Sequence, residues 1–501
     1  MPCILCKACF FLKENYMKKV IVIGGGFGGM AAAIRLRKKG YLVELVDRCN
    51  KLGGRAQVFE RNGFKYDAGP TLITAPFLFK ELFEIHNKNI SDYVKLKPID
   101  PWYRFIFHDN TILDYESSLE RTISNISKIN TKDAANYNKM LNASKDIYDL
   151  AFTKLADVPF NSFFYMLKQI PALVKFRADR SVFSFVSSNF ENDKIRRAFS
   201  IQPLLVGGNP FTTTCIYSLI HFLERKHGVH FAMGGTGALV KALAELMKDV
   251  GIKISLNTTI EKIEVKNRRI NKIFTETGKE KSADYYISNM DPLHLYNNLI
   301  TSEKSILLKY KKKFSRHSMG LFVLFFGTKK KYSNIKHHTI IFGKEYRELL
   351  DKIFLRKQLS NDISIYLHRP TATDKSFAPK GCDSFYALIP VPDLSAKINW
   401  KEEGKHFKEN VLNILDEKIL PNLKKNIIDP FYMTPKDFEK DYLAFKGTGF
   451  SIAPFFTQSA WFRFHNHSEE INNLYLVGAG THPGAGIPGV LSSAKVIDKL
   501  L

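Results

Sequence analysis

The sequence predicts an α/β fold organised around a Rossmann-like dinucleotide-binding domain, and three observations support this prediction. Near the N-terminus, an apolar strand, a glycine-rich turn, a helix and a second strand ending in an acid follow one another. At the C-terminal end, a second glycine-rich run lies between a strand and a helix. The chain has 501 residues, 45% of them hydrophobic, which is enough for an inserted second domain with its own core.

The first element is a βαβ unit of the kind that binds nucleotides. We expect strands over 20–23 and 41–46, joined by a helix over 30–39 that ends at Gly40. The first strand is entirely apolar, which is typical of a strand buried in a parallel sheet. Asp47 follows the second strand, where a carboxylate can accept hydrogen bonds from the hydroxyl groups of a ribose. This order of elements is far more specific than a glycine pattern alone.

The turn of this unit carries the pattern G-x-G-x-x-G, formed by Gly24, Gly26 and Gly29. The first glycine permits a tight turn, the second lets a pyrophosphate approach the backbone, and the third allows the helix to pack closely on the strand. Phe27 and Gly28 complete the turn. Its free N–H groups and the helix dipole stabilise phosphate charge.

Two short motifs follow this unit, GGR at 53–55 and DAGPT at 67–71. The glycine pair of the first motif lets the backbone and Arg55 approach a cofactor, and the guanidinium can pair with a phosphate. Gly69 of the second motif is expected to lie in the same site. Two unrelated surface loops would not explain why both motifs follow the nucleotide turn in this order.

Taken together, these motifs resemble those of the flavin amine oxidase and carotenoid desaturase superfamily. Three later stretches are similar to the bacterial-type phytoene desaturase family: LLVGGNPFTTTCIYSLIHFLERKHGVHFAMGGTGALVKAL at 204–243, FSIAPFFTQSAWFRFHN at 450–466 and LYLVGAGTHPGAGIPGV at 474–490. The resemblance extends from about Met17 to the C-terminus. Long motifs in the same order make it highly specific.

The resemblance implies FAD as the cofactor. It also implies a Rossmann-like FAD-binding domain assembled from three separated segments, 17–100, 226–295 and 441–501. The segments 101–225 and 296–440 would form an inserted α+β domain for substrate binding and membrane association. Because FAD is long, the N-terminal turn would hold its ADP half and the C-terminal glycine run its flavin end.

For the C-terminal run we expect a strand over 474–477, a loop over 478–489 and a helix from about Val490 whose positive end points at the flavin. His482 is interpreted as a structural hydrogen-bonding residue rather than a catalytic base. Besides the residues already named, the resemblance implies these cofactor-binding positions: Ile260, near the adenine, and Gly480, Pro488, Gly489 and Val490.

The activity implied is FAD-dependent desaturation of a membrane-dissolved carotenoid precursor, phytoene, to lycopene or a partly desaturated intermediate. Hydride would pass to flavin N5, so no catalytic side chain is predicted, and oxygen or a quinone would be the terminal electron acceptor. Desaturation of another carotenoid precursor and flavin-dependent carotenoid cis–trans isomerisation remain alternatives. The motifs GGNPF and FRFHN argue against an amine oxidase. A protein that binds flavin or lipid without turnover is a further alternative.

The chain departs from the family pattern at two places. Phe164 and Tyr165 stand where some members have an Arg-Asp pair, which weakens any mechanism that needs a charged dyad there. Phe464 stands where proline is usual, and His467 also departs from the pattern. We expect these last two near the flavin face, where they would alter substrate choice.

The net charge of +25 favours a polyanionic partner, which is either nucleic acid or an anionic membrane surface. No zinc-finger spacing or recognition helix is evident, so nucleic acid is not expected. The segments 160–178 and 304–314 mix aromatic and basic residues, as in interfacial helices, although a core helix and a solvated surface remain alternative interpretations. No uncharged run is long enough to span a bilayer. We therefore expect a cytoplasmic protein peripherally associated with the cell membrane.

Cysteines cluster at the N-terminus, where Cys3, Cys6 and Cys9 imitate part of an iron–sulfur motif but lack the next cysteine. Residues 1–16 are expected to be an extension that is disordered or not native, because a second methionine, Met17, directly precedes the first strand. The other three cysteines are scattered and predict no disulfide framework, which fits a reducing compartment. No metal site is predicted.

Overall fold

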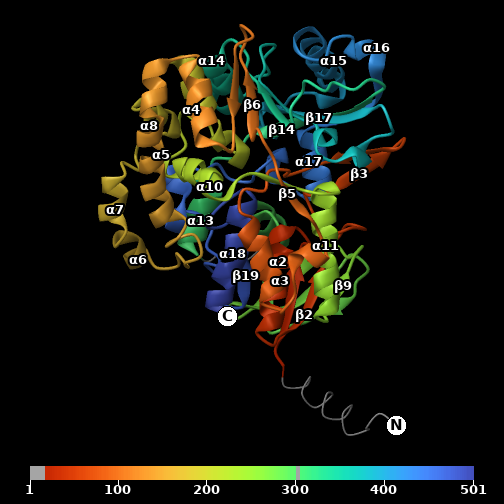
Figure 1. Cartoon of the computed structure of the whole chain (residues 1–501). Helices are drawn as coiled ribbons and strands as arrows, with labels where there is room; N and C mark the ends of the chain where they lie inside the picture. Colours follow the sequence, from red (N-terminus) through yellow and green to blue (C-terminus); the bar gives the residue numbers. More distant parts are fainter. Residues whose placement is uncertain (1–16, 301–304) are drawn as a thin grey trace.

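A five-stranded parallel sheet forms the centre of the lower half of the molecule (Figure 1). The strand order β19-β13-β1-β2-β9 brings together segments from the beginning, the middle and the end of the chain, and each neighbouring pair is parallel. The computed structural model describes residues 17–300 and 305–501. The five strands are β1 (Lys19–Ile23), β2 (Leu42–Val46), β9 (Lys253–Ser255), β13 (Tyr285–Ser288) and β19 (Leu474–Leu476).

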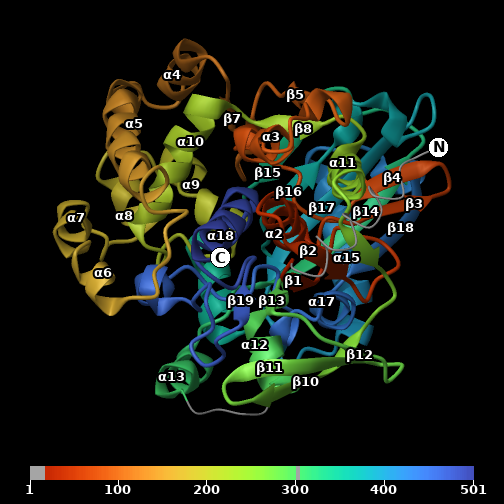
Figure 2. The same ribbon diagram turned by 90° about the horizontal axis from the view of Figure 1, so that it is seen from below.

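The two faces of this sheet are buried by different layers. Alternate side chains of a strand point to opposite faces, so Val20 and Val22 pack with the helices while Ile21 and Ile23 pack on the other side. Figure 2 shows α2 and α18 on one side and the small sheet on the other. The helices are α2 (Phe27–Lys38), α3 (Pro76–Glu84), α11 (Gly235–Asp249) and α18 (Ile487–Leu500), and the small sheet comprises β10 (Ile260–Lys266), β11 (Arg269–Thr275) and β12 (Glu280–Lys281).

A seven-stranded mixed sheet of order β18-β14-β17-β16-β15-β6-β7 forms the second centre. Its strand β14 is buried throughout, with Leu321, Val323 and Phe325 in one core and the residues between them in another. Both faces are therefore covered, one by the helical group on the left of Figure 1 and the other by α15. The strands are β6 (Tyr103–Ile106), β7 (Ile112–Tyr115), β14 (Gly320–Thr328), β15 (His338–Ile341), β16 (Ile365–His368), β17 (Asp383–Val391) and β18 (Ile427–Met433).

The helices that cover this second sheet fall into two sets. The first set contacts the core that includes Leu321, and α15 packs on the opposite core. Within the first set, α10 packs directly on α5. The helices are α4 (Leu119–Ser127), α5 (Thr131–Ala151), α8 (Val182–Ser187), α9 (Asp193–Phe199), α10 (Leu219–His227) and α15 (Trp400–Lys418).

The predicted fold class is confirmed, including both glycine-rich strand-to-helix connections. Two helix starts were predicted too late, because α2 begins at Phe27 and not at Met30, and the last helix begins at Ile487 and not at about Val490. The domain boundaries stay a prediction, and the expectation for residues 1–16 lies outside the described residues. Over 17–300 and 305–501, no helix has both the length and the apolar character needed to cross a bilayer.

Candidate functional site

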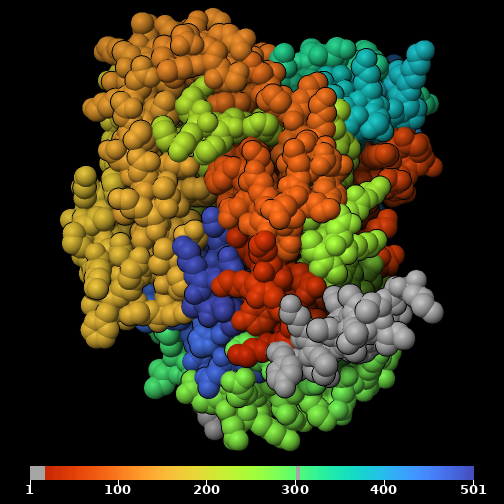
Figure 3. All heavy atoms as spheres, turned by 60° about the horizontal axis from the view of Figure 1, so that its bottom comes forward, coloured from red at the N-terminus to blue at the C-terminus, as the bar shows by residue number. Residues whose placement is uncertain are grey.

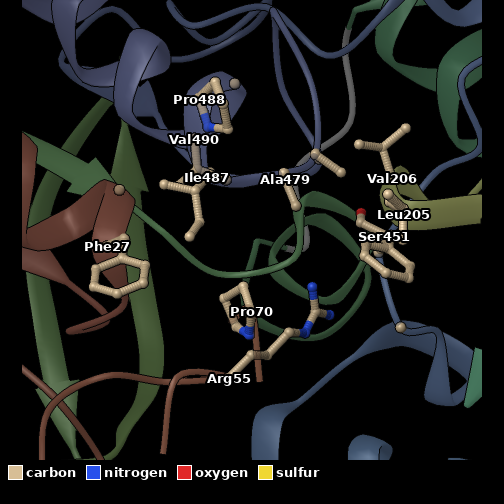
Figure 4. Close-up of a pocket in the computed structure, with 18 of the residues that line it drawn as sticks. Phe27, Arg55, Pro70, Leu205, Val206, Ser451, Ala479, Ile487, Pro488 and Val490 are labelled. Atoms are coloured by element: carbon tan, nitrogen blue, oxygen red, sulfur yellow. The ribbon is translucent and has the colours of Figure 1, made fainter. Parts of the chain in front are cut away.

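A cavity of about 570 Å³ extends from the N-terminal glycine turn into the space between the two sheets. Glycine backbone and polar groups line one end, and apolar side chains of the seven-stranded sheet and its helices line the other. Figure 4 shows Phe27, Arg55 and Pro70 facing Ala479 and Ile487 across this space. Segments far apart in the sequence thus share one continuous site.

Twelve of the thirteen predicted cofactor positions line this cavity, and Gly29 does not. A Cβ atom on Gly29 would lie 2.0 Å from the carbonyl oxygen of Gly24, so only glycine allows the helix to pack so closely on the turn. The roles of the thirteen positions in binding a cofactor stay a prediction. The positions lining the cavity are Gly24, Gly26, Phe27, Gly28, Asp47, Arg55, Gly69, Ile260, Gly480, Pro488, Gly489 and Val490.

Asp47 stabilises the loop at the nucleotide end. Its Oδ2 accepts a hydrogen bond from the Gly25 amide at 2.6 Å, and its Oδ1 accepts one from the Cys49 amide at 2.7 Å. Each carboxylate oxygen retains a second lone pair, and Asp47 lines the cavity. The carboxylate therefore fits a ribose hydroxyl pair while it also orders the backbone around it.

Arg55 and Asp291 are half-buried side chains of opposite charge that line the cavity and interact electrostatically. The Arg55 side chain points into the cavity, with Nη2 3.4 Å from the Thr448 carbonyl oxygen (Figure 4). Burial raises the pKa of Asp291, and the charge of Arg55 opposes this shift. Asp291 Oδ1 caps the short helix α12 (Pro292–His294), whereas Oδ2 is buried without a hydrogen-bond partner. An unpaired acceptor beside a guanidinium fits a polar cofactor that supplies both a donor and negative charge.

The DAGPT loop lies against the Arg55 backbone. A Cβ atom on Gly69 would lie 1.8 Å from the Arg55 carbonyl oxygen, so a larger residue cannot occupy this position without moving the main chain. This close approach brings the GGR and DAGPT motifs together at one wall of the cavity. Their order along the chain, noted in the sequence, thus reflects a direct contact.

Arg463 holds the C-terminal glycine loop in place. It is 1% exposed, and its guanidinium donates hydrogen bonds to the carbonyl oxygens of Thr481 at 3.1 Å and Ala479 at 2.6 Å. It also reaches the carbonyl oxygens of Ile452 at 3.1 Å and Gln458 at 3.3 Å. The motif containing Arg463 contributes to the family resemblance, but this function of the arginine was not predicted.

Pro488 and Gly489 belong to α18 and not to the loop, because this helix starts earlier than predicted. Pro488 lies in the first helical turn, where proline is favoured because its missing N–H has no helical partner. A Cβ atom on Gly489 would lie 2.5 Å from the Gly484 carbonyl oxygen, so Gly489 allows the helix to pack against the loop. Gly489 is thus helical, where the sequence predicted a loop residue.

His482 lies in the cavity wall with Nε2 3.2 Å from the Leu155 carbonyl oxygen. Burial lowers its pKa to about 4, so the imidazole is neutral at pH 7. The peptide bond between His482 and Pro483 is cis. These contacts agree with the interpretation of a structural residue that joins the loop to the helical domain.

Polar side chains also line the apolar half of the cavity, and apart from Thr71 of the DAGPT motif no pattern in the sequence assigned them to the site. Thr71 Oγ1 lies 3.1 Å from the hydroxyl of Tyr366 and 3.0 Å from that of Tyr386. Tyr103 donates a hydrogen bond to Glu224 at 2.7 Å. All five side chains line the cavity, although their positions are spread along most of the chain.

Three buried histidines lie behind these tyrosines. His338 Nδ1 is 2.6 Å from the Tyr366 hydroxyl, and His337 Nε2 is 3.1 Å from His368 Nε2. Their nitrogen atoms lie within 4.8 Å of one another, which is a possible metal donor set that the sequence did not predict. Burial lowers the pKa of His337 to about 3, and the charge of Arg369 adds to this effect. The same positive charge disfavours a bound cation.

The residues that depart from the family pattern do not line the cavity. Phe464 stacks on Tyr296 in a separate core, and His467 contacts Tyr475 and the Asn472 carbonyl oxygen. Neither side chain lines the cavity, although the Phe464 carbonyl oxygen accepts a hydrogen bond from the amide of His482, which does. Their effect on substrate choice stays a prediction. Phe164 is 76% exposed on the outer surface and does not line the cavity either.

Known proteins resemble this chain over nearly its whole length. The family described as flavin containing amine oxidoreductase matches residues 27–496. A phytoene desaturase (lycopene-forming) from Pantoea ananas is 43% identical over 487 residues, which cover 97% of this chain and 99% of the relative. A phytoene desaturase (neurosporene-forming) from Rhodobacter capsulatus is 37% identical over 492 residues, covering 97% and 94%.

Solved structures resemble the fold at much lower sequence identity. An oxidoreductase from Methanosarcina mazei superimposes with a TM-score of 0.65 at 16% identity, covering 96% of this chain and 100% of the other. At this identity the similarity concerns the fold alone.

Proposed function

Because this chain belongs to the flavin-containing amine oxidoreductase family, and within it to the phytoene desaturases, we propose that it desaturates phytoene to lycopene with FAD as cofactor. The observation that carries this proposal is the single cavity that joins the glycine cradle to an apolar chamber. Lycopene is preferred as product because the lycopene-forming relative is 43% identical and the neurosporene-forming relative 37%.

The residues of the polar end fit both halves of FAD. The glycine turn and Asp47 would hold the ADP half, while Arg55 and the loop secured by Arg463 would hold the remainder. When bound there, FAD supplies an acceptor for hydride. The chain binds a hydrocarbon by burying it, at about 25 cal/mol per Å² of apolar surface, and its apolar walls exclude water from the reacting carbons.

The direct test is expression of the full chain in a bacterium engineered to accumulate phytoene. We expect a coloured extract with the structured visible absorption of lycopene, and chromatography identifies the number of double bonds formed. The matched control is the same strain carrying the Gly29→Ala variant. A colourless extract that contains FAD-loaded protein would exclude phytoene as substrate. Isomerised but unoxidised carotenoid would instead support the isomerase alternative.

We further propose that the substrate enters from a membrane through the region of α6 (Phe163–Leu167), α7 (Ile170–Lys175) and α13 (Ile306–Phe314). Among the described residues, every large exposed apolar side chain except Ile112 and Leu355 lies on these helices. In Figure 3 the gold segment that includes α6 and α7 protrudes at the side of the molecule. The exposed apolar residues are Phe163, Phe164, Leu167, Ile170, Val174, Ile306, Tyr310 and Phe314.

Contacts through Trp461 join these helices into one surface. The ring of Phe163 lies 4.9 Å from that of Trp461, and Lys311 of α13 lies 5.8 Å from the same indole. Lys311 is buried and forms an ion pair with Glu469 at 2.8 Å, which anchors α13. Not all basic residues of the segment 304–314 are therefore available to a membrane surface. Exposed basic residues surrounding the apolar surface are Lys168, Lys175, Arg177, Lys309 and Lys313.

The inner side of α6 and α7 supports an entrance at this surface. Met166, Gln169 and Leu173 line the cavity, while Phe164 and Val174 of the same helices are exposed. A hydrocarbon dissolved in a bilayer would thus need to cross only this one layer of helices.

The three described cysteines outside the N-terminal cluster are free, which agrees with a cytoplasmic membrane face. We propose oxygen or a membrane quinone as the terminal electron acceptor.

The double variant Phe164→Asp, Val174→Asp is expected to lower binding to phosphatidylglycerol vesicles by about tenfold or more. Each side chain loses burial worth about 1.5–3 kcal/mol and gains a charge that anionic lipid repels. Vesicle flotation measures the effect. Ile112→Asp is the matched control, since Ile112 is 51% exposed on the distant hairpin of β7. Equal binding of both proteins would exclude this surface as the docking site.

A further inference from the structure

Glu224 of α10 is a buried carboxylate in the predominantly apolar half of the cavity. Its side chain is 0% exposed, and it lines the cavity. Its Oε1 accepts the hydrogen bond from Tyr103, whereas Oε2 is buried without a hydrogen-bond partner. A carboxylate in such surroundings is costly to retain unless the site uses it.

The same wall continues from Glu224 to the glycine cradle. The Tyr103 ring lies 6.1 Å from that of His338, which bonds to the hydroxyl of Tyr366. Tyr366 in turn contacts Thr71, two residues beyond Gly69. Glu224 is therefore linked to the glycine cradle by a chain of contacts in which Tyr103, Tyr366 and Thr71 line the cavity and His338 lies behind them.

The other carboxylates lining the cavity are less suited to accept a proton from a hydrocarbon. Both oxygens of Asp47 accept backbone N–H groups at the nucleotide end. Asp291 caps a helix and faces the charge of Arg55, and Asp441 is exposed. His482 is a weaker base, since burial lowers its pKa to about 4.

We propose that Glu224 is the proton acceptor of the desaturation, with Oε2 as the receiving atom. This proposal rests on the proposed function. Each new double bond requires the loss of a hydride from one carbon and a proton from its neighbour. The hydride leaves with its electron pair to oxidised FAD, which is thereby reduced. The second C–H bond breaks, its electron pair forms the new C=C bond, and its proton goes to Glu224.

Among the described titratable groups that surround Glu224, none has a pKa near neutrality, whereas burial also raises the pKa of Asp67, outside the cavity lining, to about 7. Burial raises the pKa of Glu224 to about 7, against the opposing effects of its bond to Tyr103 and the charge of Arg225. Tyr103, Tyr115 and Tyr137 face it with pKa values raised by burial, so they stay neutral. On its own helix, His221 also stays neutral, because burial lowers its pKa to about 4. The proton acceptor must be ionised, so the rate of flavin reduction should rise as the pH increases through about 7.

The test is anaerobic single-turnover reduction of the FAD-loaded enzyme by phytoene in vesicles. Glu224→Gln is expected to slow flavin reduction by roughly 10²–10⁴-fold and to abolish the rise with pH. Formate is expected to restore part of the rate in Glu224→Ala, whereas chloride is not. Asp133→Asn is the matched control, because Asp133 is equally buried in the neighbouring α5 and lies outside the cavity. It is expected to leave the pH profile unchanged.

Two further measurements do not depend on turnover. Infrared pH-difference spectra should show a protonated carboxyl group that titrates near neutrality and is absent in Glu224→Gln. The thermal stability of that variant should exceed that of the parent above pH 7. The folded pKa of Glu224 is raised, so its ionisation destabilises the fold as pH rises through about 7. A parent enzyme that desaturates phytoene while Glu224→Gln matches its rate would overturn this proposal alone. A parent that loads FAD but leaves phytoene unchanged would overturn the proposed function itself.

Discussion

Replacing Gly29 by alanine is expected to abolish FAD binding while much of the remaining fold persists. The new Cβ atom would lie 2.0 Å from the Gly24 carbonyl oxygen, and both groups belong to the main chain. Because no flexible side chain can yield, α2 must move away from the turn that it positions. We expect at least a tenfold loss of FAD affinity, about 1.4 kcal/mol, measured by flavin fluorescence during titration of the apoprotein.

The matched control is Gly278→Ala in the turn before β12. Gly278 has a φ of +75°, and no atom lies within 4 Å of the place that the new methyl group would take, so the substitution adds backbone strain without a clash. It should cost about 1–2 kcal/mol of stability and leave FAD affinity unchanged. If Gly29→Ala retained full affinity, the close packing of α2 on the turn would not be needed for the cofactor.

Replacing Arg463 by methionine is expected to cause the largest loss of stability. Methionine has a similar length but donates no hydrogen bonds, so four buried carbonyl oxygens lose a charged donor. A buried acceptor left without its partner costs about 1–3 kcal/mol. We expect the free energy of unfolding to fall by at least about 3 kcal/mol, with simultaneous loss of FAD, because the C-terminal loop lines the cavity. Denaturant titration and the flavin-to-protein absorbance ratio measure the two effects.

Arg463→Lys separates charge from geometry. Lysine preserves the positive charge but cannot reach carbonyl groups on several sides at once, as a planar guanidinium does. Its stability should lie between those of the parent and the methionine variant. A lysine variant as stable as the parent would show that charge, and not the hydrogen-bond geometry, holds the loop.

The parts of the site that sequence could predict are those with local causes. The glycine turn has a fixed relation to the strand before it and the helix after it, so its spacing predicted this order of elements, although α2 already begins at Phe27. The start of α18 was predicted too late, although Pro488 favours a first-turn position and thus an earlier start. The preference of proline for the first helical turn was enough to place this start, but the prediction treated the whole run up to Gly489 as a loop because of its glycines.

The parts that sequence could not predict depend on contacts between distant segments. In the sequence, Glu224 is one polar residue of an amphipathic helix. Its place in the cavity wall beside Tyr103 depends on the packing of segments that are far apart in the chain. The pairing of β15 with β6 likewise joins segments with no shared local signal. Arg463 lies in a motif that carries the family resemblance, but the carbonyl groups that it binds lie in loops whose positions follow from the whole fold.

The strands of the five-stranded sheet are synthesised at different times, and this order determines when the sheet can be completed. While the chain emerges from the ribosome, β1, β2, β9 and β13 can pair, but β13 keeps an open edge until β19 has been synthesised. An unpaired edge is a template for aggregation. Cofactor loading must therefore follow synthesis of the loop before α18, since this loop lines the same cavity as the first turn. Translation that stops before β19 is therefore expected to yield a flavin-free product whose open sheet edge promotes aggregation.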